Sequence, residues 1–247
     1  MTPLRSTVLD PLAAPDRERL LARSVERSLR RGETLTFAGE PPTRVHVVLE
    51  GVVKLVGRDV DGNESILGLC LPGELAGAMP ALDGRPQPYD YVAATALRVL
   101  GIDASLFAEV LARNPRACMA LTRLLTLRIR WLCDTALERT SAPVPARLAG
   151  RLLDLAEMIG SRTGETIDVD LPFPQRDLGG LAGMCRESAC KTLSRWKSQG
   201  TIDYRGRRLR ILRPDVLRRI RCAGRGAEPC PSGDAATSLR SGPRAGT

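Results

Sequence analysis

The sequence contains no long hydrophobic run and almost no histidine. No apolar segment reaches the roughly 18 residues that a membrane span needs, and the N-terminal residues contain no stretch suited to a signal peptide. We therefore predict a cytoplasmic protein without a membrane partner. With His46 as the one histidine there is no Ser-His-Asp arrangement, and no GxxxxGK[ST] phosphate loop occurs. The sequence thus predicts no enzymatic activity and no catalytic residues.

The number and spacing of the cysteines argue against two further classes, disulfide-stabilised proteins and metalloproteins. The seven cysteines are odd in number and irregularly placed, which argues against a disulfide framework. Cys185 and Cys190 are five residues apart, so on a helix they would point about 140° apart. None of the spacings is typical of a metal site. We expect reduced thiols, no bound metal and no cofactor.

The positive charge is concentrated in one half of the chain. The net charge is +9, but residues 1–140 hold 18 Lys/Arg against 17 Asp/Glu, whereas residues 141–247 hold 19 against 11. Residues 222–247 contribute only +1 of this excess. A basic segment of this kind favours contact with phosphates through counterion release.

Periodicity predicts an α+β protein. Residues 15–30 are helix-like. Between Glu33 and Asp103, short apolar segments separated by Gly, Pro and Asp predict an antiparallel β-barrel or jelly roll, including an Asp-Gly hairpin turn at 61–62. A long helix is then expected over about 116–139. Its apolar positions at spacings of three and four form a seam suited to pairing with a second copy: Leu121, Leu125, Ile129, Leu132 and Ala136.

The segment 174–196 predicts two short helices around a tight turn at Gly183. In the second helix, Ala189 and Leu193 fall on an apolar side, while Arg186, Glu187 and Lys191 fall on the other. Segments on either side of 205–207 predict a β-hairpin wing. Together they predict a C-terminal winged helix-turn-helix, with the recognition helix in the major groove of duplex DNA.

Several motifs in a fixed order resemble the Crp/Fnr family of bacterial transcription regulators. The resemblance covers about residues 15–215 and implies a cyclic-nucleotide-binding-type sensor barrel (15–112), a central dimerisation helix (113–140) and a winged helix-turn-helix (141–221). The motifs that support it are Arg31-Gly32-Glu33, 37–40, 47–51, Asp61-Gly62, 71–77, Asn114-Pro115, 147–156 and Arg186-Glu187-Ser188. Residues 222–247 are rich in Gly, Ala, Pro, Ser and Arg, and this composition predicts a disordered tail.

The resemblance also implies how DNA would be recognised. Crp-like recognition helices begin with an Arg-Glu pair and carry a basic residue four positions after the Glu; Arg186, Glu187 and Lys191 stand in those places. Arg186 can donate to guanine, Glu187 can accept from cytosine, and Lys191 can reach a second guanine. Ser188 and Gln175 are expected to contact phosphates. We predict a homodimer on a palindromic, TGTGA-like site, and RNA polymerase as a partner if the protein is an activator.

The effector is less well indicated. Positions that contact cyclic AMP in members of this family hold Ala78, Pro88 and Tyr89 here, and proline cannot neutralise a phosphate. The candidate effector pocket is therefore a substituted one: Gly77, Ala78, Pro88, Tyr89, Leu132 and Cys133. An apolar ligand, or no ligand, would fit this substituted pocket better than cyclic AMP.

Two alternatives remain open. The first is a redox- or haem/gas-responsive member of the same family. Its candidates are Cys185, whose oxidation beside Arg186 could block DNA entry, and His46 as a haem ligand. The second belongs to a different class, a metabolite-binding barrel without specific DNA recognition.

Overall fold

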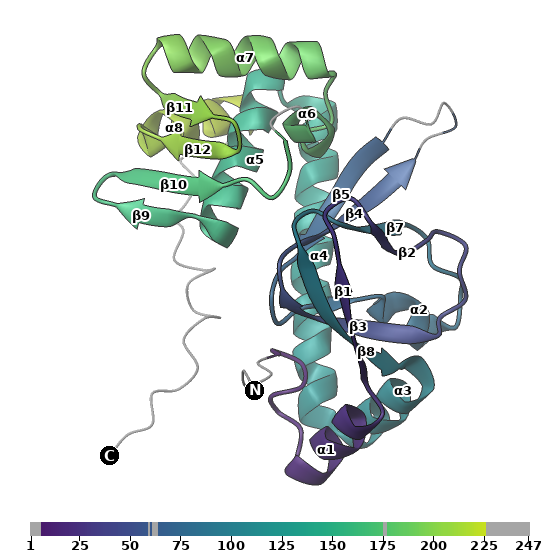
Figure 1. Ribbon diagram of the computed structural model, residues 1–247. Helices are drawn as coiled ribbons and strands as arrows, with labels where there is room; N and C mark the ends of the chain where they lie inside the picture. Colours follow the sequence, from purple (N-terminus) through teal and green to yellow (C-terminus); the bar gives the residue numbers. More distant parts are fainter. Residues whose placement is uncertain (1–5, 59, 61–63, 175–176, 226–247) are drawn as a thin grey trace. The chain divides into compact units, whose positions relative to one another are not determined.

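The computed structural model describes residues 6–58, 60, 64–174 and 177–225 (Figure 1). The chain divides into two compact units, Met1–Asp134 and Thr135–Thr247, and the division falls inside the long helix α4 (Pro115–Ser141). Within the described ranges, no helix is both long enough and apolar enough to cross a bilayer.

The N-terminal unit is built on two four-stranded antiparallel sheets. One has the strand order β1-β8-β3-β6 and the other β2-β7-β4-β5, so the unit is an open jelly roll and not a closed barrel. The strands are β1 (Val25–Leu29), β2 (Thr34–Thr36), β3 (Arg44–Glu50), β4 (Val53–Arg58), β5 (Glu64–Cys70), β6 (Leu75–Ala76), β7 (Asp90–Ala93) and β8 (Leu97–Asp103). The helices are α1 (Ala14–Ala22), α2 (Ala78–Asp83), α3 (Ala104–Arg113) and the first part of α4.

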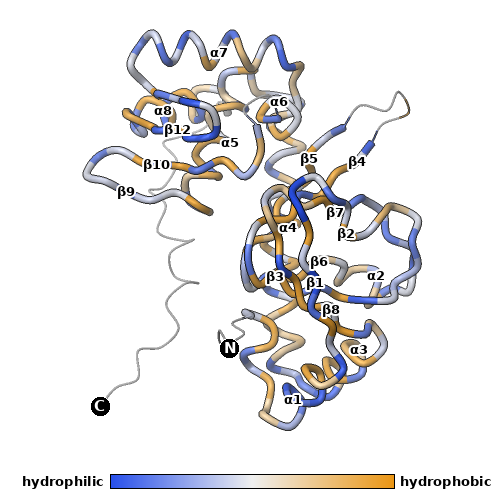
Figure 2. Tube along the Cα trace, in the orientation of Figure 1, coloured by the Kyte–Doolittle hydropathy of each residue, from blue (hydrophilic) through white to orange (hydrophobic). Residues whose placement is uncertain are grey.

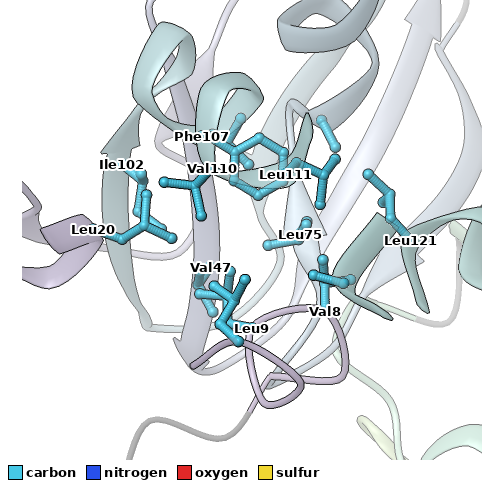
Figure 3. Close-up of a cluster of buried hydrophobic side chains, with 14 of the residues drawn as sticks. Val8, Leu9, Leu20, Val47, Leu75, Ile102, Phe107, Val110, Leu111 and Leu121 are labelled. Atoms are coloured by element: carbon cyan, nitrogen blue, oxygen red, sulfur yellow. The ribbon is translucent and has the colours of Figure 1, made fainter. Parts of the chain in front are cut away.

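Strand alternation places two hydrophobic clusters on opposite sides of β3. Val45 and Val47 join the cluster formed with α1, α3 and the start of α4 (Figure 3), whereas Val48 joins the cluster inside the roll. Successive side chains of a strand point to opposite faces, so a single strand serves both clusters. Figure 2 shows hydrophobic residues along β3, β8 and α3, the elements that contribute to the first cluster.

One predicted element was wrong. Residues 15–30 do not form a single helix, because α1 ends at Ala22 and Val25–Leu29 is strand β1. β1 pairs with β8 from Val25 opposite Gly101 to Leu29 opposite Leu97, and Leu29 is buried. Tertiary pairing with β8 overrides a local pattern that is compatible with a helix.

The C-terminal unit has the predicted winged helix-turn-helix architecture. Helix α5 (Val144–Ile159) follows the Ala142-Pro143 break, and a four-stranded sheet has the order β11-β12-β10-β9. The remaining elements are β9 (Ser161–Thr163), β10 (Thr166–Asp170), α6 (Leu178–Leu181), α7 (Arg186–Ser198), β11 (Ile202–Arg205), β12 (Arg208–Ile211) and α8 (Pro214–Arg225). The fold class expected from the sequence is confirmed. The tail was predicted to begin at 222, but helix α8 continues to Arg225. The predicted Asp61-Gly62 turn and residues 226–247 lie outside the described residues.

Candidate nucleic-acid interface

Two glycines shape the turn between α6 and α7. Gly183 has φ +62, a left-handed conformation that favours glycine, and a β-carbon there would collide with the Arg139 guanidinium. A β-carbon on Gly179 would lie 3.1 Å from the Met184 carbonyl oxygen and 3.5 Å from Ala189 Cβ. Gly179 therefore lets α7 cross close to α6, while Gly183 provides the turn and leaves room for Arg139 of α4.

Helix α7 has one buried face and one exposed face. Ala189, Thr192, Leu193 and Trp196 are buried, and Trp196 is the largest fully buried side chain of the chain's described part. The Thr192 hydroxyl donates to the Ser188 carbonyl at 2.8 Å, which satisfies a polar group on the buried side. Burial of this face fixes the rotation of α7 about its axis, so its opposite face must point to solvent.

The exposed face of α7 carries the predicted recognition residues. Arg186, Glu187 and Lys191 are exposed and Ser188 is half-buried. Lys191 Nζ lies 2.7 Å from Glu187 Oε1 in an i,i+4 pair whose side chains are about three-quarters exposed. Such a pair is worth about 0.3–0.5 kcal/mol, so both side chains can be redirected to another partner at little cost. Gln175 lies outside the described residues.

Cys185 occupies the N-cap position of α7. Its Sγ lies 3.1 Å from the Ser188 hydroxyl oxygen, and the thiol is exposed. The hydrogen bond with the Ser188 hydroxyl, followed by that from the Ser188 backbone N–H, lowers the pKa of the Cys185 thiol. A lowered pKa raises the thiolate fraction and hence the reactivity, a geometry consistent with the redox alternative.

The wing is a β-hairpin whose arginines are mostly engaged within the chain. Gly206, with φ +62, forms the turn between β11 and β12. Arg207 donates to the carbonyls of Leu171 (3.2 Å) and Pro172 (2.9 Å), and Arg210 pairs with Asp168 at 2.6 Å. Arg205 is 90% exposed, with its nearest carboxylate at 4.0 Å. Arg205 is thus the wing arginine best placed to meet a phosphate.

A buried ion network supports the recognition unit, and the sequence reasoning missed it. Arg151 of α5 is 2% exposed and donates to Glu138 of α4, to Asp154 at 2.9 Å and to the Thr135 hydroxyl at 3.0 Å. Arg221 of α8 completes the network through Asp154 at 3.0 Å. The available signal was an arginine within the apolar run 148–156, at a position that helical periodicity places on the buried face. The network joins the end of α4 to α5 and α8.

The five residues of the predicted dimer seam on α4 differ in exposure, and they do not all lie on the surface. Leu121 is 2% exposed and belongs to the N-terminal unit's own cluster (Figure 3), so it has no surface to offer a second copy. The prediction that Leu121 belongs to the seam is therefore wrong. The helix turns this side chain toward α3 and the roll, where it is already buried within its own chain. Leu125 is half-buried, whereas Ile129, Leu132 and Ala136 are exposed. These three remain a candidate contact surface.

The six predicted effector residues are spread over three elements. Gly77 has φ +80 and precedes α2, where Ala78 is buried. Pro88 is exposed and Tyr89 half-buried ahead of β7, and Leu132 and Cys133 are exposed on α4. One turn before them, Arg128 donates to Cys70 Sγ (3.3 Å) and to Glu74 Oε2 (3.1 Å). Arg128 therefore ties α4 to the end of β5 and the turn that follows it.

His46 lies inside the roll and is 4% exposed. Burial, with smaller contributions from the charges of Arg27 and Arg44, lowers its pKa to about 4. Because the usual value is 6.5, the unfolded chain binds a proton at His46 between pH 6.5 and 4 and the folded chain does not. The stability that neutral His46 contributes is therefore fully present above pH 6.5, and it is lost as the pH falls toward 4.

This linkage gives a measurable prediction. Between pH 6.5 and 4, protonation linked to His46 should lower the free energy of unfolding by about 1.4 kcal/mol per pH unit, or about 3 kcal/mol in total. Urea unfolding of the wild type and of His46→Gln at pH 7, 6, 5 and 4.5 measures the difference in slope. Because His46 is the one histidine, its ring can also be titrated by NMR without assignment. Equal slopes for the two proteins would contradict the prediction.

Two family models match the chain, one for each unit. Residues 26–114 match the cyclic nucleotide-binding domain, and residues 146–220 match the Crp-like helix-turn-helix domain. A jelly roll, a long helix and a winged helix-turn-helix in this order define a class of DNA-binding transcription regulators. The chain belongs to the Crp/Fnr family.

Named relatives agree with this assignment. The chain is 28% identical over 189 residues to the CRP-like cAMP-activated global transcriptional regulator of Mycobacterium tuberculosis (strain ATCC 25618 / H37Rv), covering 76% of this chain and 84% of that one. It is 25% identical to the transcriptional activator protein FnrA of Stutzerimonas stutzeri, covering 75% and 76%. Among solved structures, FixK2 from Bradyrhizobium japonicum superimposes with a TM-score of 0.70 at 22% identity, covering 80% and 96%, which shows the shared fold.

Proposed function

We propose that this protein binds a palindromic DNA site as a homodimer, with α7 of each copy in the major groove. The observation that carries the proposal is the exposed row Arg186, Glu187 and Lys191 on a helix whose opposite face is buried. Arg186 would donate to the N7 and O6 atoms of a guanine, and Glu187 would accept from a cytosine N4 amino group. The exposed Glu187–Lys191 pair is weak enough to open when bases replace it.

The dimer would form through α4. Ile129 and Leu132 are 59% and 48% exposed, and Ala136 lies on the same side of the helix. Apolar residues at this spacing are suited to a parallel helix pair. Two copies related by a twofold axis would present two α7 helices, so the site should be an inverted repeat with half-site centres about 10 base pairs apart.

The family assignment supports the rest of the proposal. We propose that the protein acts in the cytoplasm without enzymatic activity, binds an effector in the roll, and contacts RNA polymerase if it is an activator. In the described part of the chain, no group of His, Cys, Asp and Glu side chains could hold a metal ion. The jelly-roll cavity that contains His46 has a volume of about 190 Å³. That is below the roughly 300 Å³ at which pockets for drug-sized ligands begin, so a haem at His46 is disfavoured.

The test combines molar mass with selection of DNA. Light scattering should give twice the chain mass, and selection from random duplexes should enrich an inverted repeat with G·C pairs in each half-site, close to TGTGA. Selection is run at one fixed salt concentration, because phosphate contacts are salt-dependent. A monomer in solution together with equal retention of all duplexes would overturn the proposal and favour the metabolite-binding alternative.

A further inference from the structure

The jelly roll contains a cavity whose lining is mostly polar. Its volume is about 190 Å³, and all its lining residues belong to the N-terminal unit. They come from β1, β2, the 40–43 loop, β3 and the segments on either side of α2, and include Arg27, Arg44, His46, Gly77 and Gln87. Of the six predicted effector residues, only Gly77 is among them. The cavity is therefore a different place from the effector pocket expected from the sequence.

Two buried side chains in the lining have polar atoms without a protein partner. Nδ1 and Nε2 of His46 and Oε1 of Gln87 make no hydrogen bond within the described residues, and both residues are 4% exposed. Buried polar groups in proteins are nearly always hydrogen-bonded, because an unpaired one destabilises the fold. Three unpaired atoms around one cavity indicate that something other than the protein satisfies them.

The backbone around His46 leaves room for its ring. His46 on β3 stands opposite Gly101 on β8, and a β-carbon at Gly101 would lie 3.3 Å from both His46 Cδ2 and Arg44 Cδ. Glycine at position 101 therefore lets the imidazole lie close to the backbone of β8. Gly77, which also lines the cavity, has φ +80, a left-handed conformation that favours glycine, and a β-carbon there would lie 3.2 Å from the Arg44 carbonyl oxygen.

The charge of the lining is positive. Arg27 and Arg44 line the cavity, against one carboxylate, Glu40. Each guanidinium makes one hydrogen bond to a backbone carbonyl, Arg44 to Gly101 at 3.2 Å and Arg27 to Leu35 at 3.5 Å. A guanidinium has five N–H donors, so donors beyond these two bonds can meet a ligand. Two arginines favour a carboxylate, which accepts charge-assisted hydrogen bonds.

We propose that this cavity binds a small carboxylate that also carries an O–H or N–H donor, such as a short hydroxy acid or amino acid. The carboxylate would accept from Arg27 and Arg44, and the donor would meet the Gln87 amide oxygen or the unprotonated nitrogen of His46. A neutral imidazole supplies one donor and one acceptor, and the low pKa of His46 keeps it neutral at pH 7. The volume holds roughly six water molecules at about 30 Å³ each, which suits a ligand of this size and not a nucleotide.

The experiment uses the full chain labelled with ¹⁵N-histidine, and it does not depend on DNA binding. His46 is the one histidine, so a single set of ring signals reports on the cavity. Glycolate, L-lactate and L-alanine are titrated at constant ionic strength, with lactamide as the uncharged counterpart of lactate. We expect at least one carboxylate to shift the ring signals saturably, with a dissociation constant of roughly 1 mM or tighter, and lactamide to have no such effect.

Variants separate the cavity from a nonspecific effect of charge. Arg27→Gln/Arg44→Gln should weaken carboxylate binding at least tenfold, whereas Arg31→Gln/Arg116→Gln removes equal charge from exposed side chains outside the cavity and should bind normally. Gln87→Met should also weaken binding, and unchanged thermal unfolding of the arginine variants shows that they fold. The proposal is overturned if no carboxylate shifts the ring at roughly ten times that dissociation constant, if lactamide acts like lactate, or if both double variants bind equally.

Discussion

Glutamine in place of Glu138 is expected to lower the free energy of unfolding of the C-terminal unit by about 3 kcal/mol. The Glu138 and Arg151 side chains are 4% and 2% exposed, so the substitution leaves a buried guanidinium short of one counter-charge. Asp154 remains 2.9 Å from Arg151, which keeps the expected loss at the lower end of the range for a broken buried pair.

Urea unfolding can measure this loss locally. Trp196 is buried in the C-terminal unit, and a Trp131→Phe background makes its fluorescence the only tryptophan signal. The matched control is Asp215→Asn, which breaks an arginine–carboxylate pair at 2.9 Å whose side chains are 71% and 60% exposed. Asp215→Asn should lower the free energy of unfolding by no more than about 0.5 kcal/mol. Equal losses in the two variants would show that burial of the Glu138 pair carries no extra stability.

A double substitution separates charge from packing. Glu138→Leu/Arg151→Met removes both buried charges and keeps apolar bulk, so it should recover most of the stability lost in Glu138→Gln. If the double variant is less stable than Glu138→Gln, the network stabilises the unit beyond the cost of an unpaired charge.

Alanine in place of Arg186 is expected to weaken binding to the selected operator by about 1–3 kcal/mol and to change binding to random duplex little. Arg186 is exposed in the first turn of α7, so the substitution should leave the fold unchanged. Its loss removes a bidentate donor to guanine, which is an interaction made only on the correct sequence.

The control for Arg186 lies on the same helix. Arg195 is also exposed on α7, and Arg195→Ala removes the same charge nine residues further on. We expect Arg195→Ala to preserve the ratio of operator to random-duplex affinity, measured by fluorescence anisotropy at one salt concentration. If Arg186→Ala also preserves that ratio, Arg186 contacts phosphate and does not read a base.

Local pattern was sufficient to predict most of the architecture. The recognition segment shows why: Gly183 requires a left-handed conformation, and the alternation of Ala189 and Leu193 with Glu187 and Lys191 assigns each side of α7 without knowledge of its neighbours. The strands of the roll were similarly clear, because glycine and proline separate them and alternation faces one side inward.

Local pattern failed where partners distant in sequence decide the outcome. Val25–Leu29 is compatible with a helix until β8 pairs with it. Leu121 lies in line with the exposed seam of α4, and only the position of the roll and α3 shows that it is already buried. Both cases depend on contacts that no window of neighbouring residues contains.

The sequence by itself determined the order of the elements, the class of regulator and which side chains of α7 face solvent, because turn chemistry and apolar periodicity are local properties. Only the tertiary structure decided which charges are buried and which polar atoms lack partners. Arg151 and Glu138 meet because helix α5 packs against the end of the helix before it, α4, whereas His46 and Gln87 reach one cavity from segments far apart in the chain. Desolvation acts only on groups that the fold encloses in this way.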